Sequence, residues 1–174
     1  YASADGWLAG GGVHLISLKP RISSLWNEKT YKVNERMTTL SYEAHVKYTG
    51  RNFAFAAKSL MASCLDHTAL IGGYGISSIN PDNGEQEYTP FRHSTSWVNF
   101  TYGTKWKGHF FAGYTKNLGT TDALASATKY GMGLDIDQVF STNIAFSYNL
   151  PHWQIGVEYM PTTAWYGDTD RASG

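Results

Sequence analysis

The sequence lacks three features that would point to common classes of protein. Its 174 residues contain no apolar run near the roughly 18 residues that a membrane-spanning helix needs, which excludes a helical membrane protein. It has a single cysteine, Cys64, which excludes an intrachain disulfide and a cysteine-based zinc site; we interpret it as a small apolar packing residue. Its 14 basic and 14 acidic residues balance without a basic tract, so nothing indicates a nucleic-acid partner.

Alternation of apolar and polar residues is the main pattern that the sequence does have. In residues 40–48, leucine, tyrosine, alanine and valine occupy one parity, and serine, glutamate, histidine and lysine occupy the other. Successive side chains of a β-strand point to opposite faces, so this segment predicts a strand with one apolar and one charged face. The pattern recurs in residues 98–102, 110–114, 144–148 and 153–159, which predicts an all-β fold.

Tyrosine repeatedly ends the apolar parity of these segments. Tyrosine prefers the interface between membrane and water, with its ring toward the apolar side and its hydroxyl group toward the headgroups. Alternating strands with aromatic ends are typical of transmembrane β-barrels, which have a lipid-facing apolar band and a polar lumen. We therefore predict an antiparallel up-and-down transmembrane β-barrel. The predicted membrane-interface aromatics are Tyr48, Tyr102, Tyr114, Tyr148 and Tyr159.

Seven strands are expected, each bounded by turn or loop residues. They cover residues 7–17, 36–48, 53–62, 92–102, 107–116, 135–148 and 152–160. Short connections between these strands alternate with long ones at 18–35, 63–91 and 117–134, as they do in outer-membrane barrels with short periplasmic turns and long external loops. Within the middle loop, we expect the strand-like residues 69–76 to extend the preceding strand or fold into the pore, rather than to form an extra hairpin.

The odd number of expected strands means that the first and the last run in the same direction. Bacterial single-chain barrels have an even number of strands, and an open sheet edge in lipid leaves backbone groups unpaired at a cost of several kcal/mol each. We therefore expect residues 1–174 to be part of a single barrel domain in a longer chain. The remaining strands would precede residue 1, follow residue 174, or both.

Three stretches of the chain resemble bacterial outer-membrane porins: the glycine-rich residues 7–17, residues 34–59 and residues 157–168. The family that the chain resembles is that of the DcaP-like trimeric porins of Gram-negative bacteria. The resemblance covers most of the chain and rests on no short catalytic or binding motif. It implies a cell outer-membrane location, contact with the lipid bilayer and lipopolysaccharide, a homotrimer, and a water-filled channel for passive diffusion of small hydrophilic solutes.

The polar parity of the predicted strands supplies candidate pore-lining residues. Charged groups at a constriction set the ion and solute preference of a channel. The candidates are Glu43, His45, Lys47, Lys58 and Glu158. The same parity also holds Trp97 and Phe111, the aromatic residues that a sugar-stacking surface in the lumen would need.

The histidines and serines form no pattern that indicates catalysis or metal binding. None of the six histidines belongs to an HxH or HxxxH pair, and no GxSxG motif occurs. Ser41, Glu43 and His45 share one strand face, but same-face neighbours are about 7 Å apart, too far for a direct Ser–His hydrogen bond. We expect no enzyme, no metal site and no cofactor.

Periodicity does not distinguish the inside of a barrel from its outside, so two alternatives stay open. A soluble calycin-like β-barrel would line its cavity with the apolar parity and bind a small hydrophobic ligand. A small non-conducting outer-membrane barrel would serve as an anchor or adhesin. The tyrosine ends and the alternating lengths of the connections favour the membrane pore.

Overall fold

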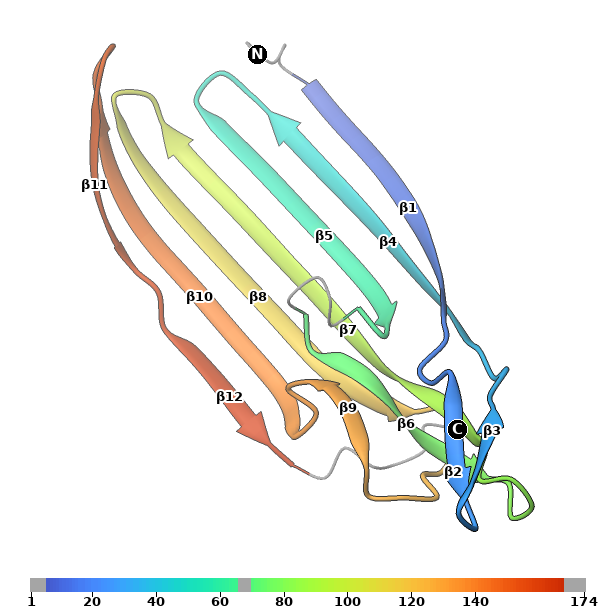
Figure 1. Cartoon of the computed structure of the whole chain (residues 1–174). Coiled ribbons are helices and arrows are strands. Elements are labelled where there is room, and N and C mark those ends of the chain that lie inside the picture. The colour runs from blue at the N-terminus through green and yellow to red at the C-terminus, as the bar shows by residue number, and fades with distance from the viewer. Residues whose placement is uncertain (1–5, 66–69, 168–174) are drawn as a thin grey trace.

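The computed structural model describes residues 6–65 and 70–167, which form β-strands and their connections (Figure 1). Strands make up 73% of the structure, and the described residues form no helix. The main antiparallel sheet has the order β1 (Gly6–Leu18), β4 (Met37–Thr49), β5 (Phe53–Ser63), β7 (Gln86–Gly103), β8 (Trp106–Thr120), β10 (Ile136–Asn149) and β11 (Gln154–Tyr159). The predicted all-β antiparallel class is therefore confirmed.

Five shorter strands complete the described fold. β6 (Gly72–Ile79) pairs with β7 and with β9 (Lys129–Met132), and β12 (Thr162–Tyr166) pairs with β10. β2 (Ser23–Trp26) and β3 (Lys29–Lys32) form a separate two-stranded sheet. The three segments predicted as long loops thus contain strands of their own.

The short and long connections lie at opposite ends of the main sheet (Figure 1). The short ones, at 50–52, 104–105 and 150–153, join β4 to β5, β7 to β8, and β10 to β11. The turn after β7 requires glycine, because Gly103 has a φ of +115° and a side chain there would collide with the carbonyl group of Trp106. The alternation of connection lengths agrees with the sequence prediction.

Residues 72–79 form a hairpin with β7, which is the arrangement that the sequence analysis disfavoured; residue 69 lies outside the described residues. The turn of this hairpin is built locally: the amide of Gly84 donates to the carbonyl of Asn80 at 2.9 Å, and Gly84 has a φ of +68°. Asn80 Oδ1 also accepts from the amide of Asp82 at 2.9 Å. A segment rich in turn residues is therefore a hairpin turn rather than an open loop.

The pairing along β10 continues beyond residue 160, where the sequence analysis ended the seventh strand. β11 ends at Tyr159, and β12 resumes alongside the same strand, β10, at Thr162. Pro161 lies between β11 and β12 and interrupts their pairing with β10, because it has no amide proton to donate. Its carbonyl still accepts a hydrogen bond from the amide of Thr142 at 3.1 Å. The chain after Tyr159 is therefore a continued strand with a break.

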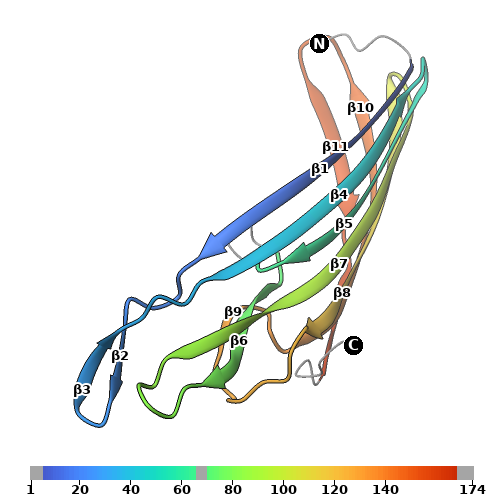
Figure 2. The same cartoon turned by 90° about the vertical axis from the view of Figure 1, so that its right-hand side faces the viewer.

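The main sheet is curved, and Figure 2 shows it as a trough with β6 and β9 on its concave side. Along β4, Met37, Thr39 and Ser41 are buried, whereas Leu40 and Tyr42 are exposed. The polar parity of β4 thus faces the covered, concave side. Directly paired residues of neighbouring strands share a face, so the register carries this assignment across the sheet.

We call residues 6–16, 40–61, 96–115 and 140–159 the wall, and residues 17–39, 62–65, 70–95, 116–139 and 160–167 the cap. The wall contains the ends of the long strands nearest the short turns. Its apolar parity covers the convex face and is strongly exposed: Val13 is 75% exposed, and Tyr102 and Phe146 are each 61% exposed.

The cap holds every buried hydrophobic residue among those that the structure describes. They are Val33, Met37, Ala62, Cys64, Leu65, Ile76 and Phe91. β6 and β9 supply a second strand layer near this core (Figure 2). In the cap, alternate residues of β7 (Thr89, Phe91 and His93) are buried on the concave side, whereas the wall has no buried apolar residue among those that the structure describes.

The main sheet is open within the described residues. β1 forms one edge, β11 and β12 form the other, and no pairing joins the two edges. β1 and β11 run in the same direction, because six antiparallel pairings separate them. The described residues thus form an antiparallel sheet and not a closed barrel.

Candidate functional site

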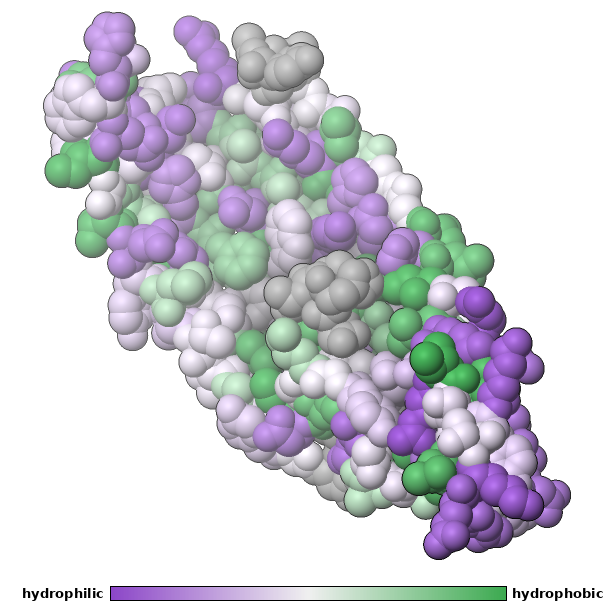
Figure 3. Space-filling view, viewed as in Figure 1, coloured by the Kyte–Doolittle hydropathy of each residue, from purple (hydrophilic) through white to green (hydrophobic). Residues whose placement is uncertain are grey.

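The concave face of the wall is the candidate functional site, because it gathers polar side chains from six neighbouring strands. The register places them side by side: His45 of β4 pairs with Lys58 of β5, and Lys58 pairs with Trp97 of β7. Figure 3 looks onto this face and shows hydrophilic side chains spread across the wall. All five predicted lining residues share it: Glu43, His45, Lys47, Lys58 and Glu158.

Glu43 lies at the centre of a charged cluster on β4 and β5. Its carboxylate lies 3.1 Å from Nδ1 of His45 and 3.3 Å from Nζ of Lys58. Two glycines of β1 leave room for these groups, since a Cβ at Gly10 would lie 2.7 Å from the His45 ring and one at Gly12 would lie 3.1 Å from the Glu43 carboxylate. The glycine-rich sequence of β1 thus makes space for the cluster.

The other two predicted lining residues lie apart from this cluster. Lys47 pairs with Leu8 and Ala56 and forms no ion pair within the described part of the chain. Glu158 lies on the edge strand β11, where it accepts a hydrogen bond from Nδ2 of Asn143 at 3.3 Å. The structure therefore joins three of the five predicted residues and separates the other two.

Trp97 and Phe111 form an aromatic surface in the middle of the concave face. Their ring centroids are 6.2 Å apart with an interplanar angle of 37°. Both side chains lie near Gly113: a Cβ there would lie 3.0 Å from Cζ of the Phe111 ring and 3.6 Å from Cβ of Trp97. Glycine at this position therefore allows Phe111 to lean toward Trp97. The sequence placed both aromatics on the polar parity, and the register agrees.

His109 is the centre of a hydrogen-bond chain that the sequence analysis missed. Its Nδ1 lies 3.1 Å from Oγ1 of Thr101, and its Nε2 lies 3.1 Å from Oγ of Ser147. Asn149 Nδ2 also donates to Ser147 Oγ, at 3.1 Å. Ser147 is only 5% exposed and the third partner is a hydroxyl group, not a carboxylate, so the chain orients His109 rather than preparing a nucleophile.

A hollow of about 600 Å³ lies beside the aromatic surface, over β7, β8, β10 and β11. Its side chains on the concave parity are mostly neutral hydrogen-bonding groups, and Glu158 is its one carboxylate. The residues that matter most for its chemistry are Asn99, His109, Phe111, Asn143, Gln154 and Glu158. Together with Trp97, they make a surface that combines aromatic rings with amide groups.

Three of the five predicted interface tyrosines lie on the convex face at the short-turn end: Tyr48, Tyr102 and Tyr148. Trp7 lies 4.8 Å from Tyr48 between ring centroids, and Trp106 lies 4.5 Å from Tyr148. Aromatic side chains thus line this end of the wall, where the apolar band meets the turns.

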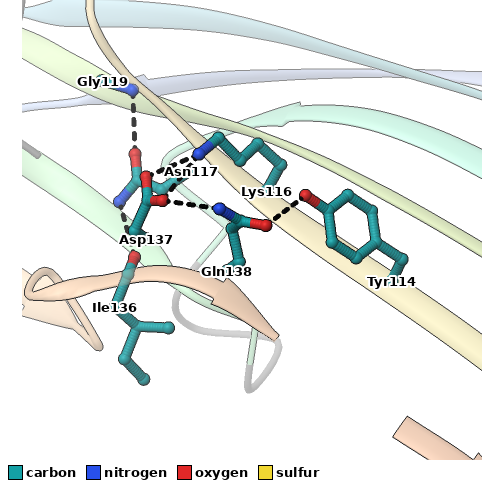
Figure 4. A network of polar contacts seen from close by, with 7 residues as sticks. All are labelled: Tyr114, Lys116, Asn117, Gly119, Ile136, Asp137 and Gln138. Atoms are coloured by element: carbon teal, nitrogen blue, oxygen red, sulfur yellow. Dashed lines mark hydrogen bonds and ion pairs between the residues drawn. The ribbon is translucent and has the colours of Figure 1, made fainter. Parts of the chain in front are cut away.

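The other two predicted interface tyrosines lie elsewhere on the convex face. Tyr114 lies toward the cap, and its hydroxyl donates to Oε1 of Gln138 at 2.7 Å (Figure 4). Tyr159 is the last residue of β11 and pairs with Ile144, and β12 continues along β10 after it. The assignment of Tyr114 and Tyr159 to a membrane interface stays a prediction.

A second polar network at the border of wall and cap was also missed by sequence reasoning. Nζ of Lys116 lies 2.7 Å and 2.8 Å from the two carboxylate oxygens of Asp137, which also accepts from Nε2 of Gln138 at 2.9 Å (Figure 4). Asn117 donates to the carbonyl of Ile136 at 3.3 Å beside the register shift in β10. The network joins β8 to β10 at the border between the wall and the cap.

His93 is the most unusual polar residue of the cap. It is 1% exposed, and neither ring nitrogen has a hydrogen-bond partner among the described residues. It pairs with Ala62 and Asn117, and Gly72 lies over it. Burial lowers the pKa of His93 to about 4, because the charged imidazolium is poorly solvated there.

The described residues contain no group of three or more histidine, cysteine, aspartate or glutamate side chains arranged to hold a metal ion. His67, one of the histidines considered from the sequence, lies outside the described residues. No helix among residues 6–65 and 70–167 is long and apolar enough to cross a membrane.

Comparisons with family models, with curated proteins and with solved structures found no match to this chain.

Proposed function

We propose that this chain forms the wall of an outer-membrane pore through which small hydrophilic solutes diffuse. One observation carries the proposal: the wall has its apolar face on the convex side and its polar face on the concave side. In a transmembrane barrel, the convex face meets lipid and the concave face lines the aqueous lumen. The aromatic residues at the short-turn end support the same orientation, since they suit a membrane interface.

The exposed convex face would be costly in water. Soluble monomers rarely expose contiguous apolar patches larger than a few hundred Å². On this face, Val13, Phe100, Phe146 and Val157 are 39–75% exposed on four different strands. In lipid, the same side chains remain in an apolar medium, which removes this cost.

The concave face argues against the soluble, calycin-like alternative. Such a barrel binds a hydrophobic ligand in a cavity lined by its apolar parity. Here the concave side carries the Glu43–His45–Lys58 cluster and the hydrogen-bond chain around His109. These groups need water or a polar solute, so the orientation of the curvature favours a pore.

The open edges of the sheet require further strands in a bilayer, since unpaired backbone groups in lipid are costly. Because β1 and β11 run in the same direction, antiparallel closure adds an odd number of strands. The pore in this proposal is therefore a larger barrel. Its contact with lipid and lipopolysaccharide and its assembly as a homotrimer are included because the resemblance to trimeric porins implies them.

Opposite charges are mixed on the concave face, so this part of the wall imposes no strong selection by charge. Glu43 and Glu158 are acidic, and Lys47 and Lys58 are basic. Lys58 is already paired with Glu43 at 3.3 Å. Passive diffusion of small hydrophilic solutes, with weak discrimination between anions and cations, fits this arrangement.

The experiment that tests the pore is planar-bilayer conductance of the full-length protein extracted in detergent. We expect stepwise, ohmic conductance with little preference between potassium and chloride ions. A protein that inserts but does not conduct would support the anchor or adhesin alternative. A protein that extracts into aqueous buffer without detergent would support the soluble alternative, and either result overturns the pore.

A further inference from the structure

We propose that the concave face holds a binding site for neutral, polyhydroxylated solutes, of which saccharides are the representative class. The site comprises the aromatic surface of Trp97 and Phe111 and the adjacent hollow over β7, β8, β10 and β11. This inference rests on the proposed pore, because it assigns that pore a preferred solute. It goes further by naming the residues that hold the solute.

The aromatic rings supply the first part of the argument. Both Trp97 and Phe111 are partly exposed on a face that is otherwise polar, and their rings are 6.2 Å apart. Hydrophobic side chains in the wall otherwise lie mainly on the convex face, so these two are not explained by contact with lipid. A sugar ring has an apolar face of C–H groups, which packs well against an aromatic ring.

Gly113 supplies the second part of the argument, because its missing side chain leaves space on the sheet between Trp97 and Phe111. A Cβ at this position would lie 3.0 Å from Cζ of Phe111, closer than ordinary contact allows. The absent side chain lets Phe111 lie over β8 toward Trp97 rather than stand up from the sheet. The surface is thus built by three strand positions together.

The hollow supplies the third part, because its polar groups suit hydroxyl groups. Asn99 and Asn143 lie in the same register row as Phe111, one on each side of it. Amide side chains both donate and accept hydrogen bonds, as sugar hydroxyls do. Asn143 also donates to Glu158 at 3.3 Å, which leaves a carboxylate at the rim of the hollow as a further acceptor.

Charge explains why the site suits a neutral solute better than an ion. Glu158 is the one carboxylate lining the hollow, and no lysine or arginine lines it. The nearest basic neighbour of Trp97 is its register partner Lys58, whose ammonium group already pairs with Glu43 at 3.3 Å. Lys107 lies on the same face as the register partner of Ser147, but it is not among the residues that line the hollow. An anion would therefore find no cation in the lining itself, and a cation would find a single carboxylate.

The test uses the full-length protein, with maltotriose as probe and a polyethylene glycol of similar mass as a neutral control for size. Trp97→Ala removes the larger ring, and Trp97→Phe keeps a smaller one. Phe100→Ala is the matched control, because Phe100 lies on the same strand but on the convex face. Two readouts are taken: interruption of single-channel current by the sugar, and calorimetric binding of the sugar in detergent.

We expect maltotriose to interrupt the current and bind to the wild type, and the polyethylene glycol to do neither in a concentration-dependent way. Trp97→Ala should weaken the sugar's binding at least about tenfold, Trp97→Phe should weaken it less, and Phe100→Ala should leave it unchanged. A conducting wild type that maltotriose neither blocks nor binds would overturn the site and leave the pore intact. Equal affinities for the wild type and Trp97→Ala would also overturn the site.

A non-conducting wild type would overturn the pore and, with it, the assignment of a preferred solute. Calorimetry then still decides whether the concave face binds sugar. Binding that Trp97→Ala weakens would retain a sugar site on a non-conducting barrel, whereas no binding would overturn the site as well.

Discussion

The wall and the cap are built from the same strands but follow opposite rules of packing. On β7, Phe91 lies in the cap and is 0% exposed, whereas Phe100 lies in the wall and is 39% exposed. The cap buries apolar side chains between layers of strands, as water-soluble domains do. The wall leaves its apolar face uncovered and presents polar groups on the inner side of its curve. One end of the sheet therefore carries its own core, and the other end leaves an apolar face uncovered, which the proposed pore places against lipid.

The largest expected effect separates the two regions on this single strand. Phe91→Ala should lower the free energy of unfolding by about 3–5 kcal/mol, because it leaves a cavity in the core of the cap. Phe100→Ala should change it by less than about 1 kcal/mol in detergent, since detergent tails occupy the space left by the ring. Equilibrium unfolding in detergent micelles measures both variants. Equal losses would show that the wall is packed like the cap.

The next effect concerns the two faces of the wall. Val46→Arg should block insertion or cost about 2–4 kcal/mol, because it places a charge on the convex face near the middle of the apolar band. His45→Arg, one residue away on the concave face, should insert normally and mainly alter conductance. Folding into lipid vesicles and planar-bilayer recordings compare the pair. Equal tolerance at both positions would contradict the assignment of the faces.

A pH effect is expected in the cap. The pKa of His93 falls to about 4 in the folded protein, so on acidification the unfolded chain takes up a proton before the folded chain does. The stabilisation from neutral His93 is complete above its ordinary pKa of about 6.5 and is lost as the pH falls toward 4, by on the order of 2 kcal/mol.

Unfolding in detergent at pH 7.5, 5.5 and 4.5 measures this loss. His93→Gln does not titrate and serves as the control, so its stability should change less over the same range. Identical pH dependence in the wild type and His93→Gln would show that other groups in the protein cause the loss.

The smallest effect concerns the border between the two regions. Asp137→Asn should destabilise the protein by about 1 kcal/mol, because the Lys116–Asp137 pair is short but partly solvated. A double-mutant cycle with Lys116→Met measures the coupling between the two side chains. A coupling above about 3 kcal/mol would show that the pair is desolvated and that the cap is tightly packed up to its border with the wall.

The wall could be predicted from the sequence because its signals are local. The period-two pattern in residues 40–48 fixes which side chains share a face, and this face now carries the Glu43–His45–Lys58 cluster. The pattern does not state which face is concave. That information comes from the curvature of the sheet and from the buried residues at the start of β4.

The cap could not be predicted because its strands depend on distant partners. β6 pairs with residues 86–91 of β7, a segment that contains Pro90 and reads as a loop, and with β9. The His109–Ser147 contact likewise joins positions 38 residues apart, and only the register of β8 against β10 brings them together. Sequence spacing alone holds no signal for either arrangement.

The central claim is that the convex face of the wall meets lipid and the concave face meets water. The most direct test is site-directed spin labelling along residues 42–48 in lipid bilayers, on a Cys64→Ser background that removes the one native cysteine. We expect accessibility to alternate: labels at 42, 44, 46 and 48 should collide with oxygen dissolved in lipid, and labels at 43, 45 and 47 with a water-soluble nickel complex. The opposite phase, or no alternation, would contradict the account.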